Sequence, residues 1–385
     1  MLPFARMVRY GNKVPLPAGI KKINSFGTSQ MILTSTGEVY AYGQNTNWRF
    51  GSGSSSEISG GVPQMVMQGV SDMICHPRCT LLIMSDGRYL AAGDSTVLGG
   101  SSGLNYVDVS SKFATLGTIK KIDFTRRNST SYTVYALNTD GDLYGIGYGN
   151  RGQLGLGKNN SLGTFTKINT NCRNFASCSY ETIVALKNDN TAWFCGNYQF
   201  ISGNTDVTTF TNLGDTAILN IYGNGLNGEL LYTKSDGLYF RGLSSNRYGY
   251  SFSLEQRAIN SKITLPFSYD VSTFKILTDE QTTTVSVWIS NSDVHYGVGA
   301  NNSGTNRMGF TNPTVPGAGS NFTLQDFSSV NGTIETVVSA GNYTSLINSD
   351  GIVFGSGPFD DDSLTYFPGN NPKLMNYTQI KLNIN

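Results

Sequence analysis

The feature of this sequence that most constrains its fold is a short phrase that returns along the chain. It is clearest at 140–157, DGDLYGIGYGNRGQLGLG, where the turn pair Asp140-Gly141 leads into a short apolar run that ends at Gly147. Glycine supplies the positive φ that a tight hairpin turn needs, so the pair predicts a β-hairpin whose second strand is the apolar run. A phrase that returns at a fixed period decides the architecture of the whole chain.

The phrase returns in six other places, at intervals of roughly fifty residues. Two copies have Asn190 and Asp293 in place of the turn glycine, and Asn and Asp are enriched among the non-glycine residues that adopt positive φ. A period of about fifty residues is typical of bladed or solenoid proteins. The seven turn positions are Gly37, Gly87, Gly141, Asn190, Gly237, Asp293 and Gly351.

Each turn position separates two apolar runs, and a third run lies upstream of most of them. The run Leu81–Met84 is apolar without alternation, which indicates a strand covered on both faces. Helical periodicity is almost absent. We therefore expect an all-β fold, a seven-bladed β-propeller formed by residues 1–385 as a single domain. We also expect the terminal strands to close the ring, with one terminal segment completing a blade that the other begins.

The third copy of the phrase resembles the repeat of the regulator of chromosome condensation family. That repeat has Asp-Gly, three apolar residues, Trp-Gly, and then Asn-x-x-Gly-Gln-Leu-Gly. Here Gly141-Asp-Leu-Tyr-Gly-Ile-Gly147 and Asn150-Arg-Gly-Gln-Leu-Gly155 match it well, and the other units keep only the framework. The Leu-Gly slot of other units is filled by Phe50-Gly51, Leu98-Gly99, Tyr248-Gly249 and Met308-Gly309.

The resemblance implies the seven-bladed fold and leaves the function open, because one fold hosts unrelated partners. The founding member of the family activates the small GTPase Ran and binds chromatin through a basic tail. This chain shows no such tail, and no stretch of it aligns with the wedge that promotes nucleotide exchange. The usual Trp before the second glycine is also replaced, for example by Cys195 in the fourth unit, where we expect a small buried apolar side chain.

The amino-acid composition of the chain limits the classes of partner that we expect it to bind. Charged residues make up 14% of the chain, below the roughly 25% of ordinary soluble domains. The formal net charge is +1, so the composition does not indicate a basic surface that would bind nucleic acid. The sequence has no run of about twenty apolar residues, so it predicts no transmembrane helix. A surface rich in Asn, Ser, Thr, Gly and Tyr is similar to that of bacteriophage tail, fibre and decoration proteins. We therefore expect a virion component assembled in the host cytoplasm, with a cytoplasmic protein as the alternative.

The five cysteines do not predict a disulfide framework, because their number is odd and their spacing follows no known scaffold. The segment Cys75-His76-Pro-Arg-Cys79 contains three residues of zinc-ligand type. It offers only these three in an apparent loop before a strand, so we expect neither a metal site nor a cofactor.

The loops that follow the second glycine of each unit should emerge on one face of a propeller and form a ring. Aromatic residues and arginines interleaved with Asn are typical of protein interfaces. A second interpretation places Arg49, Arg247 and Arg307 in the family's Gln slot, where they would brace neighbouring blades. The predicted binding residues are Trp48, Arg49, Tyr148, Asn150, Arg151, Tyr198, Phe200, Arg247 and Arg307.

These observations predict a non-enzymatic binding or structural module that contacts other virion proteins, or a protein or glycan of the host surface. The alternative within the same fold is a regulator, either an exchange factor for a small GTPase or an enzyme inhibitor. A third hypothesis is a carbohydrate-active enzyme, in which acidic residues from different blades converge near the centre of the ring.

Overall fold

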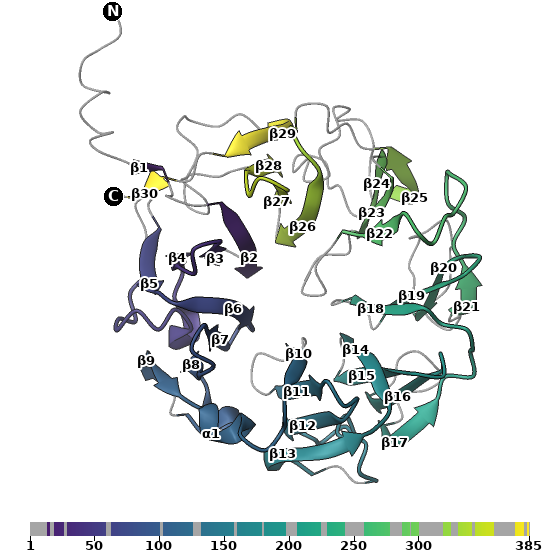
Figure 1. The fold of residues 1–385 in the computed structure, drawn as a ribbon, viewed down its shortest axis with the longest axis horizontal. Helices are drawn as coiled ribbons and strands as arrows, with labels where there is room; N and C mark the ends of the chain where they lie inside the picture. The colour runs from purple at the N-terminus through teal and green to yellow at the C-terminus, as the bar shows by residue number, and fades with distance from the viewer. Residues whose placement is uncertain are drawn as a thin grey trace, which may run out of the picture.

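Each repeat folds into one antiparallel sheet of four consecutive strands, and seven such sheets stand around a common axis in the computed structural model (Figure 1). The fold is the predicted all-β, seven-bladed β-propeller. The residues that the structure describes are 14–15, 19–26, 29–58, 63–100, 103–125, 132–157, 160–178, 181–197, 206–224, 229–242, 258–277, 287–292, 294–299, 319–324, 330–340, 343–357, 374–380 and 383–384.

Every blade has the same strand order, from an inner strand near the axis to an outer strand at the periphery (Figure 1). The inner strands are β2 (Ile20–Phe26), β6 (Val70–Cys75), β10 (Ile119–Phe124), β14 (Cys172–Cys178), β18 (Asn220–Asn224), β22 (Phe274–Ile276) and β26 (Ile334–Ala340). The second strands are β3 (Ser29–Thr34), β7 (Cys79–Met84), β11 (Thr133–Asn138), β15 (Thr182–Lys187), β19 (Glu229–Lys234), β23 (Val287–Asn291) and β27 (Tyr343–Asn348).

The third strands follow the hairpin turns, and the outer strands complete the sheets. The third strands are β4 (Val39–Gly43), β8 (Tyr89–Gly93), β12 (Leu143–Gly147), β16 (Ala192–Asn197), β20 (Gly237–Gly242), β24 (Val294–Gly299) and β28 (Val353–Gly357). The outer strands are β5 (Gln64–Met67), β9 (Gly103–Asp108), β13 (Leu162–Asn169), β17 (Asp206–Asn212), β21 (Ala258–Lys262), β25 (Gly319–Leu324) and β29 (Leu374–Ile380).

The hairpin turns have the backbone that the sequence predicts. Gly141 has φ +84°, and Asn190, which stands in the glycine position of the fourth unit, has φ +66°. The side chain of Asp189 accepts hydrogen bonds from the backbone and hydroxyl of Thr191 and so stabilises the same turn. The predicted turn at Asp293 lies outside the described residues.

The hydrophobic core lies between the blades. Within the described residues, buried apolar side chains form seven clusters, and each cluster joins two adjacent blades. One of them packs Ile20, Ile23 and Tyr40 of the first blade against Ile347 and Val353 of the seventh. Near-continuous apolar strands are therefore needed, because both faces of a sheet contact a neighbouring sheet.

The ring closes between complete blades. The N–H of Ile20 donates to the carbonyl of Gly351 at 2.9 Å, as the N–H of Val70 donates to Gly37 between the first two blades. The first blade consists of β2–β5 and the seventh of β26–β29, so the expectation that one terminal segment completes a blade begun by the other is wrong. The terminal strands do pair, β1 (Val14–Pro15) with β30 (Asn383–Ile384), but as a separate two-stranded ladder.

Helices are short. The described residues contain 3-10 turns η3 (Thr46–Trp48) and η4 (Thr96–Leu98) and a single helical turn, α1 (Ser110–Phe113). No helix in the described part of the chain is long and apolar enough to cross a membrane.

Candidate functional site

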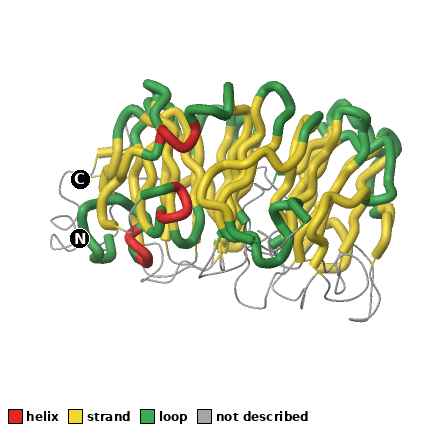
Figure 2. The backbone as a smooth tube through the Cα atoms, turned by 90° about the horizontal axis from the view of Figure 1, so that it is seen from below, coloured by secondary structure: helices red, strands yellow, loops and turns green. Residues whose placement is uncertain are grey.

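The propeller has two faces of different character (Figure 2). The hairpin turns, such as the one at Gly141, lie on one face, which we call the turn face. The segments that follow the third strands, such as those after Gly43 and Gly147, lie on the other, which we call the loop face. The predicted binding residues that the structure describes belong to the loop face.

On the loop face the Leu-Gly pair of one blade docks on the outer strand of the next. A Cβ on Gly155 would lie 2.5 Å from the ring of Phe210, and a Cβ on Gly51 would lie 2.3 Å from the ring of Tyr106. Isolated β-bridges continue both contacts, for example between Leu156 and Thr209. The Leu-Gly pair therefore connects neighbouring blades at these two boundaries. Only glycine fits at positions 51 and 155, because a side chain there would collide with the aromatic ring of the next blade.

Arg49 is buried between the first two blades. The residue is only 5% exposed. Its guanidinium donates to the hydroxyl of Ser29 in its own blade and, at 2.8 Å, to the carbonyl of Pro77 in the next blade. Burial lowers the pKa of the guanidinium to about 10, so the group remains charged at neutral pH. Arg49 therefore contacts the neighbouring blade, as the second interpretation of the arginines predicts.

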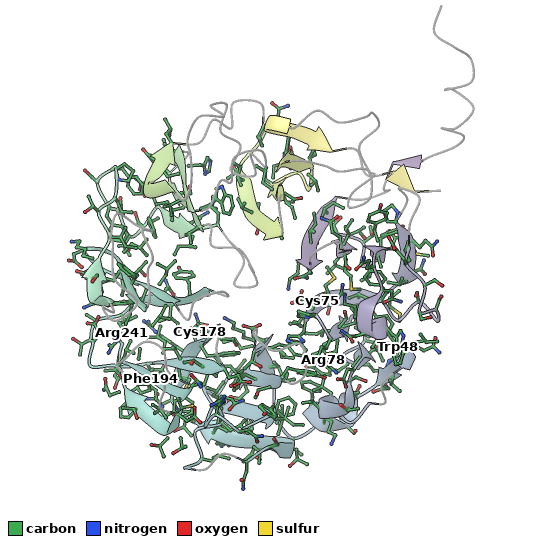
Figure 3. The ribbon with its side chains drawn as sticks, turned by 180° about the vertical axis from the view of Figure 1, so that it is seen from behind. Trp48, Cys75, Arg78, Cys178, Phe194 and Arg241 are labelled. Atoms are coloured by element: carbon green, nitrogen blue, oxygen red, sulfur yellow. The ribbon has the colours of Figure 1, made fainter. Side chains whose placement is uncertain are left out.

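Trp48 is the exposed aromatic of the same turn (Figure 3). The residue is 39% exposed and has φ +59°, a left-handed backbone that bulky residues rarely adopt. Counting back from the Leu-Gly slot, Trp48 stands where the third unit has Gly152, whose φ is +77°. A tryptophan thus occupies the position that glycine fills in the third unit.

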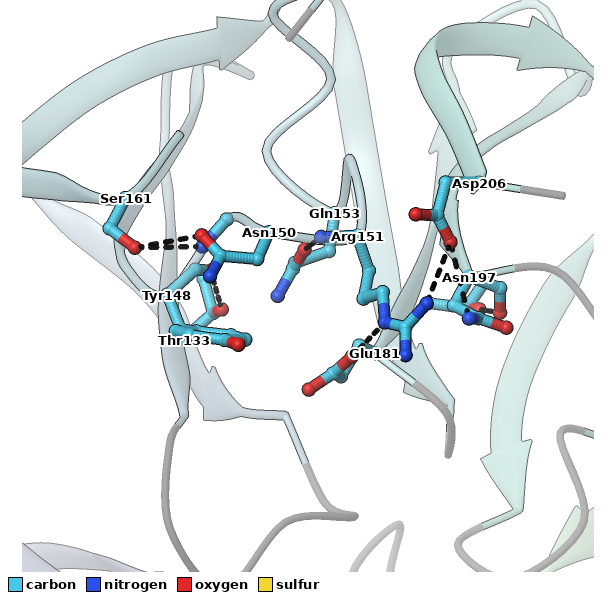
Figure 4. A network of polar contacts seen from close by, with 11 residues as sticks. Thr133, Tyr148, Asn150, Arg151, Gln153, Ser161, Glu181, Asn197 and Asp206 are labelled. Atoms are coloured by element: carbon cyan, nitrogen blue, oxygen red, sulfur yellow. Dashed lines mark hydrogen bonds and ion pairs between the residues drawn. The ribbon is translucent and has the colours of Figure 1, made fainter. Parts of the chain in front are cut away.

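Arg151, Asn150 and Tyr148 lie at the boundary of the third and fourth blades (Figure 4). The guanidinium of Arg151 is 3.8 Å from Glu181 and 3.7 Å from Asp206, both in the fourth blade. Its side chain is 52% exposed, so these ion pairs are screened by water. Asn150 is exposed and Tyr148 is half-buried.

The structure places the described predicted residues in two groups, each at a blade boundary. Trp48 and Arg49 lie beside the second blade, and Tyr148, Asn150 and Arg151 lie beside the fourth. The other predicted binding residues lie outside the described residues: Tyr198, Phe200, Arg247 and Arg307.

Sequence reasoning missed an ion pair on the loop face of the second blade. Arg78 donates to Asp94 through Nε at 2.9 Å and through Nη2 at 2.6 Å. Burial opposes ionisation of Asp94, but hydrogen bonds from Thr96 and Arg78 outweigh it and hold the pKa of that carboxyl below its usual value. The hydroxyl of Tyr132, from the third blade, donates to the backbone carbonyl of Asp94. The signal in the sequence was an Arg before the second strand and an Asp after the third.

The Cys75-His76-Cys79 segment does not form a metal site in the described part of the chain, where no three residues of ligand type converge. Cys75 and Cys79 are buried, and the backbone N–H of Arg78 donates to Nδ1 of His76. Cys195 is also fully buried, as expected for a small apolar side chain in its slot.

All five thiols should be unreactive in the folded protein. Burial raises the pKa of Cys75 and Cys79 from 9.0 to about 12, and that of Cys172 to about 11. A raised folded-state pKa contributes stability that is present below the unfolded pKa and lost as pH rises. We therefore expect the free energy of unfolding to fall between pH 9.0 and about 12.

The measurement is reaction with a thiol-specific disulfide reagent at neutral pH, before and after addition of denaturant. We expect all five groups to react only when the chain is unfolded, because the thiolate is the nucleophile. Rapid labelling of the native protein, with unchanged circular dichroism, would show that the thiols are accessible.

Comparisons with known proteins find a relative that contains the same kind of repeat. No family model matches the chain. An RCC1 repeat-containing protein of Dictyostelium discoideum is 28% identical over 175 residues, which cover 41% of this chain and 35% of that protein, so the match spans about a third of the relative's length.

Solved structures of similar shape include Prp20p of Saccharomyces cerevisiae, with 13% identity, a TM-score of 0.46, and coverage of 94% of this chain and 77% of that one. Human WBSCR16 has 11% identity and a TM-score of 0.49, with coverage of 96% and 83%. Both scores are below 0.5, so the blade number rests on the strand pairing described above. The chain is a seven-bladed β-propeller whose repeats are similar to those of RCC1 proteins.

Proposed function

We propose that this chain is a non-enzymatic module that binds other proteins through its loop face, with Trp48 as the anchor. The observation that carries the proposal is an exposed tryptophan in a left-handed backbone, at a position where the third unit has glycine. A non-glycine residue in this region costs on the order of 1–3 kcal/mol and persists only where the surroundings hold it. Such strain concentrates at functional sites.

The surroundings of Trp48 do hold it. Asn47 donates through Nδ2 to the carbonyl of Pro77 at 3.2 Å, and Arg49 donates to the same carbonyl at 2.8 Å. Both residues that flank Trp48 are thereby fixed to the second blade. A preorganised aromatic side chain loses little entropy when it is buried by a partner, which is why tryptophan is enriched among the residues that dominate binding energy.

The carboxylates of the loop face support binding over acid–base catalysis. Asp94 is held ionised by Arg78 and Thr96, and Glu181 and Asp206 lie within ion-pair distance of Arg151. A general acid needs a raised pKa, whereas the pKa of Asp94 is lowered. Glu181 and Asp206 instead contact Arg151 of the neighbouring blade.

Trp48→Gly should separate stability from binding. Glycine tolerates φ +59°, so we expect the free energy of unfolding to stay level or to rise by about 1 kcal/mol, while the partner complex weakens at least about tenfold. The measurement is photo-crosslinking from position 48 in the cells that make the protein, followed by mass spectrometry. A photo-reactive residue at Asp86, exposed on the turn face, is the control.

Crosslinks to one defined protein from position 48 and not from position 86 support the proposal. Equal labelling from both positions contradicts it. So does a Trp48→Gly variant that retains the complex, because the anchor would then be elsewhere.

We propose that the protein is a virion component of the tail, fibre or decoration. It contacts other virion proteins, or a protein or glycan of the host surface. The alternative is a cytoplasmic protein. The support is the low charged fraction of 14%. Immunogold labelling of purified particles tests it, and absence of label from intact and disrupted particles rejects it.

The alternative is a regulator, favoured by the RCC1 repeats; the solved structure of Prp20p is described together with its binding to Gsp1p and histones. Accelerated nucleotide release from a small GTPase would favour this alternative.

A further inference from the structure

The inner strands share an irregularity at the turn face. In five of the seven, the register against the second strand skips one residue near the start of the inner strand. Such β-bulges re-aim the side chain of the extra residue and are over-represented beside functional sites. The extra residues are Lys21, Ser71, Lys120, Arg173 and Glu335.

Three of these bulge residues are cations, and each reaches the next blade. Nζ of Lys21 donates to the carbonyl of Ser71 at 2.7 Å, and Nζ of Lys120 donates to the carbonyl of Arg173 at 2.8 Å. Arg173 continues the series, because its Nη2 donates to the carbonyls of Ile218 and Leu219 at 2.6 and 2.8 Å. The cations therefore lie on the inner strands of the first, third and fourth blades, whose places in the ring Figure 1 shows.

In the first and third blades the residue after the bulge adds a second cation to this rim. Lys22 forms an ion pair with Asp72 at 3.0 Å, and Lys121 donates to the carbonyl of Phe175 at 2.8 Å. We call the set Lys21, Lys22, Lys120, Lys121 and Arg173 the inner cationic arc. It holds five cations, although the whole chain has a net charge of only +1. Two carboxylates belong to the same rim: Asp72, which pairs with Lys22, and Glu335, the bulge residue of the seventh blade.

The same face carries carboxylates farther from the axis. The hairpin turns lie beside the second and third strands, outside the inner rim, and they expose acidic side chains. These are Asp86, Asp140, Asp189, Asp236 and Asp350. Asp86 is paired with Arg88 and Asp236 with Lys262, at 2.8 and 2.9 Å. The turn face therefore presents a cationic centre, and Asp140, Asp189 and Asp350 carry negative charge farther from the axis.

We propose that the inner cationic arc binds a short acidic segment of a partner protein, end-on at the centre of the turn face. An extended polyanion such as a nucleic acid would have to cross the acidic turns, which repel it. A peptide with a few Glu or Asp side chains matches the small cationic centre. This surface is on the opposite face from Trp48, so the proposal is independent of the proposed function.

The contacts between blades leave the arc able to bind. An ammonium has three N–H donors, and Lys21 and Lys120 each use one on a backbone carbonyl while remaining exposed. The carbonyl contacts hold the ammonium groups at the rim, which reduces the entropy lost when a carboxylate binds.

The experiment measures fluorescence anisotropy of a labelled oligoglutamate peptide with the full chain at low salt. We expect the double variant K21Q/K120Q to weaken binding about tenfold, because each exposed cation contributes on the order of 0.5–1 kcal/mol. K21R/K120R should retain the affinity. The matched control is K167Q/K262Q, which removes two lysines from outer strands.

An equal loss in K167Q/K262Q, or no binding of oligoglutamate by the wild-type chain, overturns the proposal. Tighter binding of single-stranded DNA that K21Q/K120Q abolishes also overturns it, because the surface then serves nucleic acid. Carbodiimide cross-linking of wild-type protein to the peptide keeps the test valid if the variant fails to fold. Mapping should find Lys21 or Lys120, and a product confined to Lys167 and Lys262 contradicts the proposal.

Discussion

Replacing Gly196 with alanine should lower the free energy of unfolding by about 3 kcal/mol or more, the largest effect we expect from adding one methyl group. Gly196 is the penultimate residue of the third strand of the fourth blade and has φ +117°. A Cβ there would lie 2.1 Å from the carbonyl oxygen of Glu181, which is backbone and has no room to retreat. The substitution therefore combines a strained backbone with a collision. Chemical denaturation followed by circular dichroism measures the change.

Two other glycines separate the two causes. Gly87 has φ +88° but nothing within 4 Å of an added Cβ, so Gly87→Ala should cost only the strain, about 1 kcal/mol. Gly163 has neither the positive φ nor a close neighbour, so Gly163→Ala should leave stability within about 0.5 kcal/mol of the wild type. If all three variants lose the same stability, the contact with Glu181 is not the cause.

Arg49→Met should destabilise the protein by about 2–4 kcal/mol, because it removes the buried donor to the hydroxyl of Ser29 and leaves the carbonyl of Pro77 with only the longer hydrogen bond from Asn47. Methionine retains much of the side-chain volume, so the lost interaction is the guanidinium and not the packing. The β-bridge between Ser52 and Asn105 would still join the first two blades on the loop face. Thermal and denaturant unfolding both measure the effect.

The matched control is Arg151→Met. That guanidinium is 52% exposed and lies 3.7 and 3.8 Å from its carboxylates, so its loss should cost less than about 1 kcal/mol. Two arginines that stand two slots apart in the repeat thus have different roles. Equal destabilisation by the two substitutions would contradict the view that Arg49 alone is a buried brace.

The blade number was predictable because the hairpin turn needs a particular backbone, and few residues provide it. Glycine marks most of the turns, and Asn190 could be recognised as a substitute from its side chain alone. The second glycine of each unit was equally visible. The apolar runs around the turns are strong because both faces of each sheet are buried.

The outer strands were not predicted individually, since one side of them faces solvent. β13, with the sequence LGTFTKIN, alternates weakly and carries polar residues, so its composition resembles that of a loop. The closure was predicted wrongly, because nothing in the terminal sequences distinguishes a shared blade from a separate ladder.

Trp48 and the inner cationic arc also differ in how far the sequence could predict them. Trp48 could be placed in the glycine slot by aligning Phe50-Gly51 with Leu154-Gly155, but its strained backbone and exposure came only from the structure. The inner cationic arc had no signal in the net charge, because its members come from three blades and are brought together by the fold. A β-bulge also leaves no mark on composition.

The closure between complete blades has a consequence for how such a chain changes over generations. Each sheet is built from consecutive strands, so the stretch of gene that encodes a repeat also encodes a whole sheet. A duplication or deletion of one repeat adds or removes an intact blade, with no half-sheet left at the seam. Propellers whose ends share a sheet do not have this freedom at their junction.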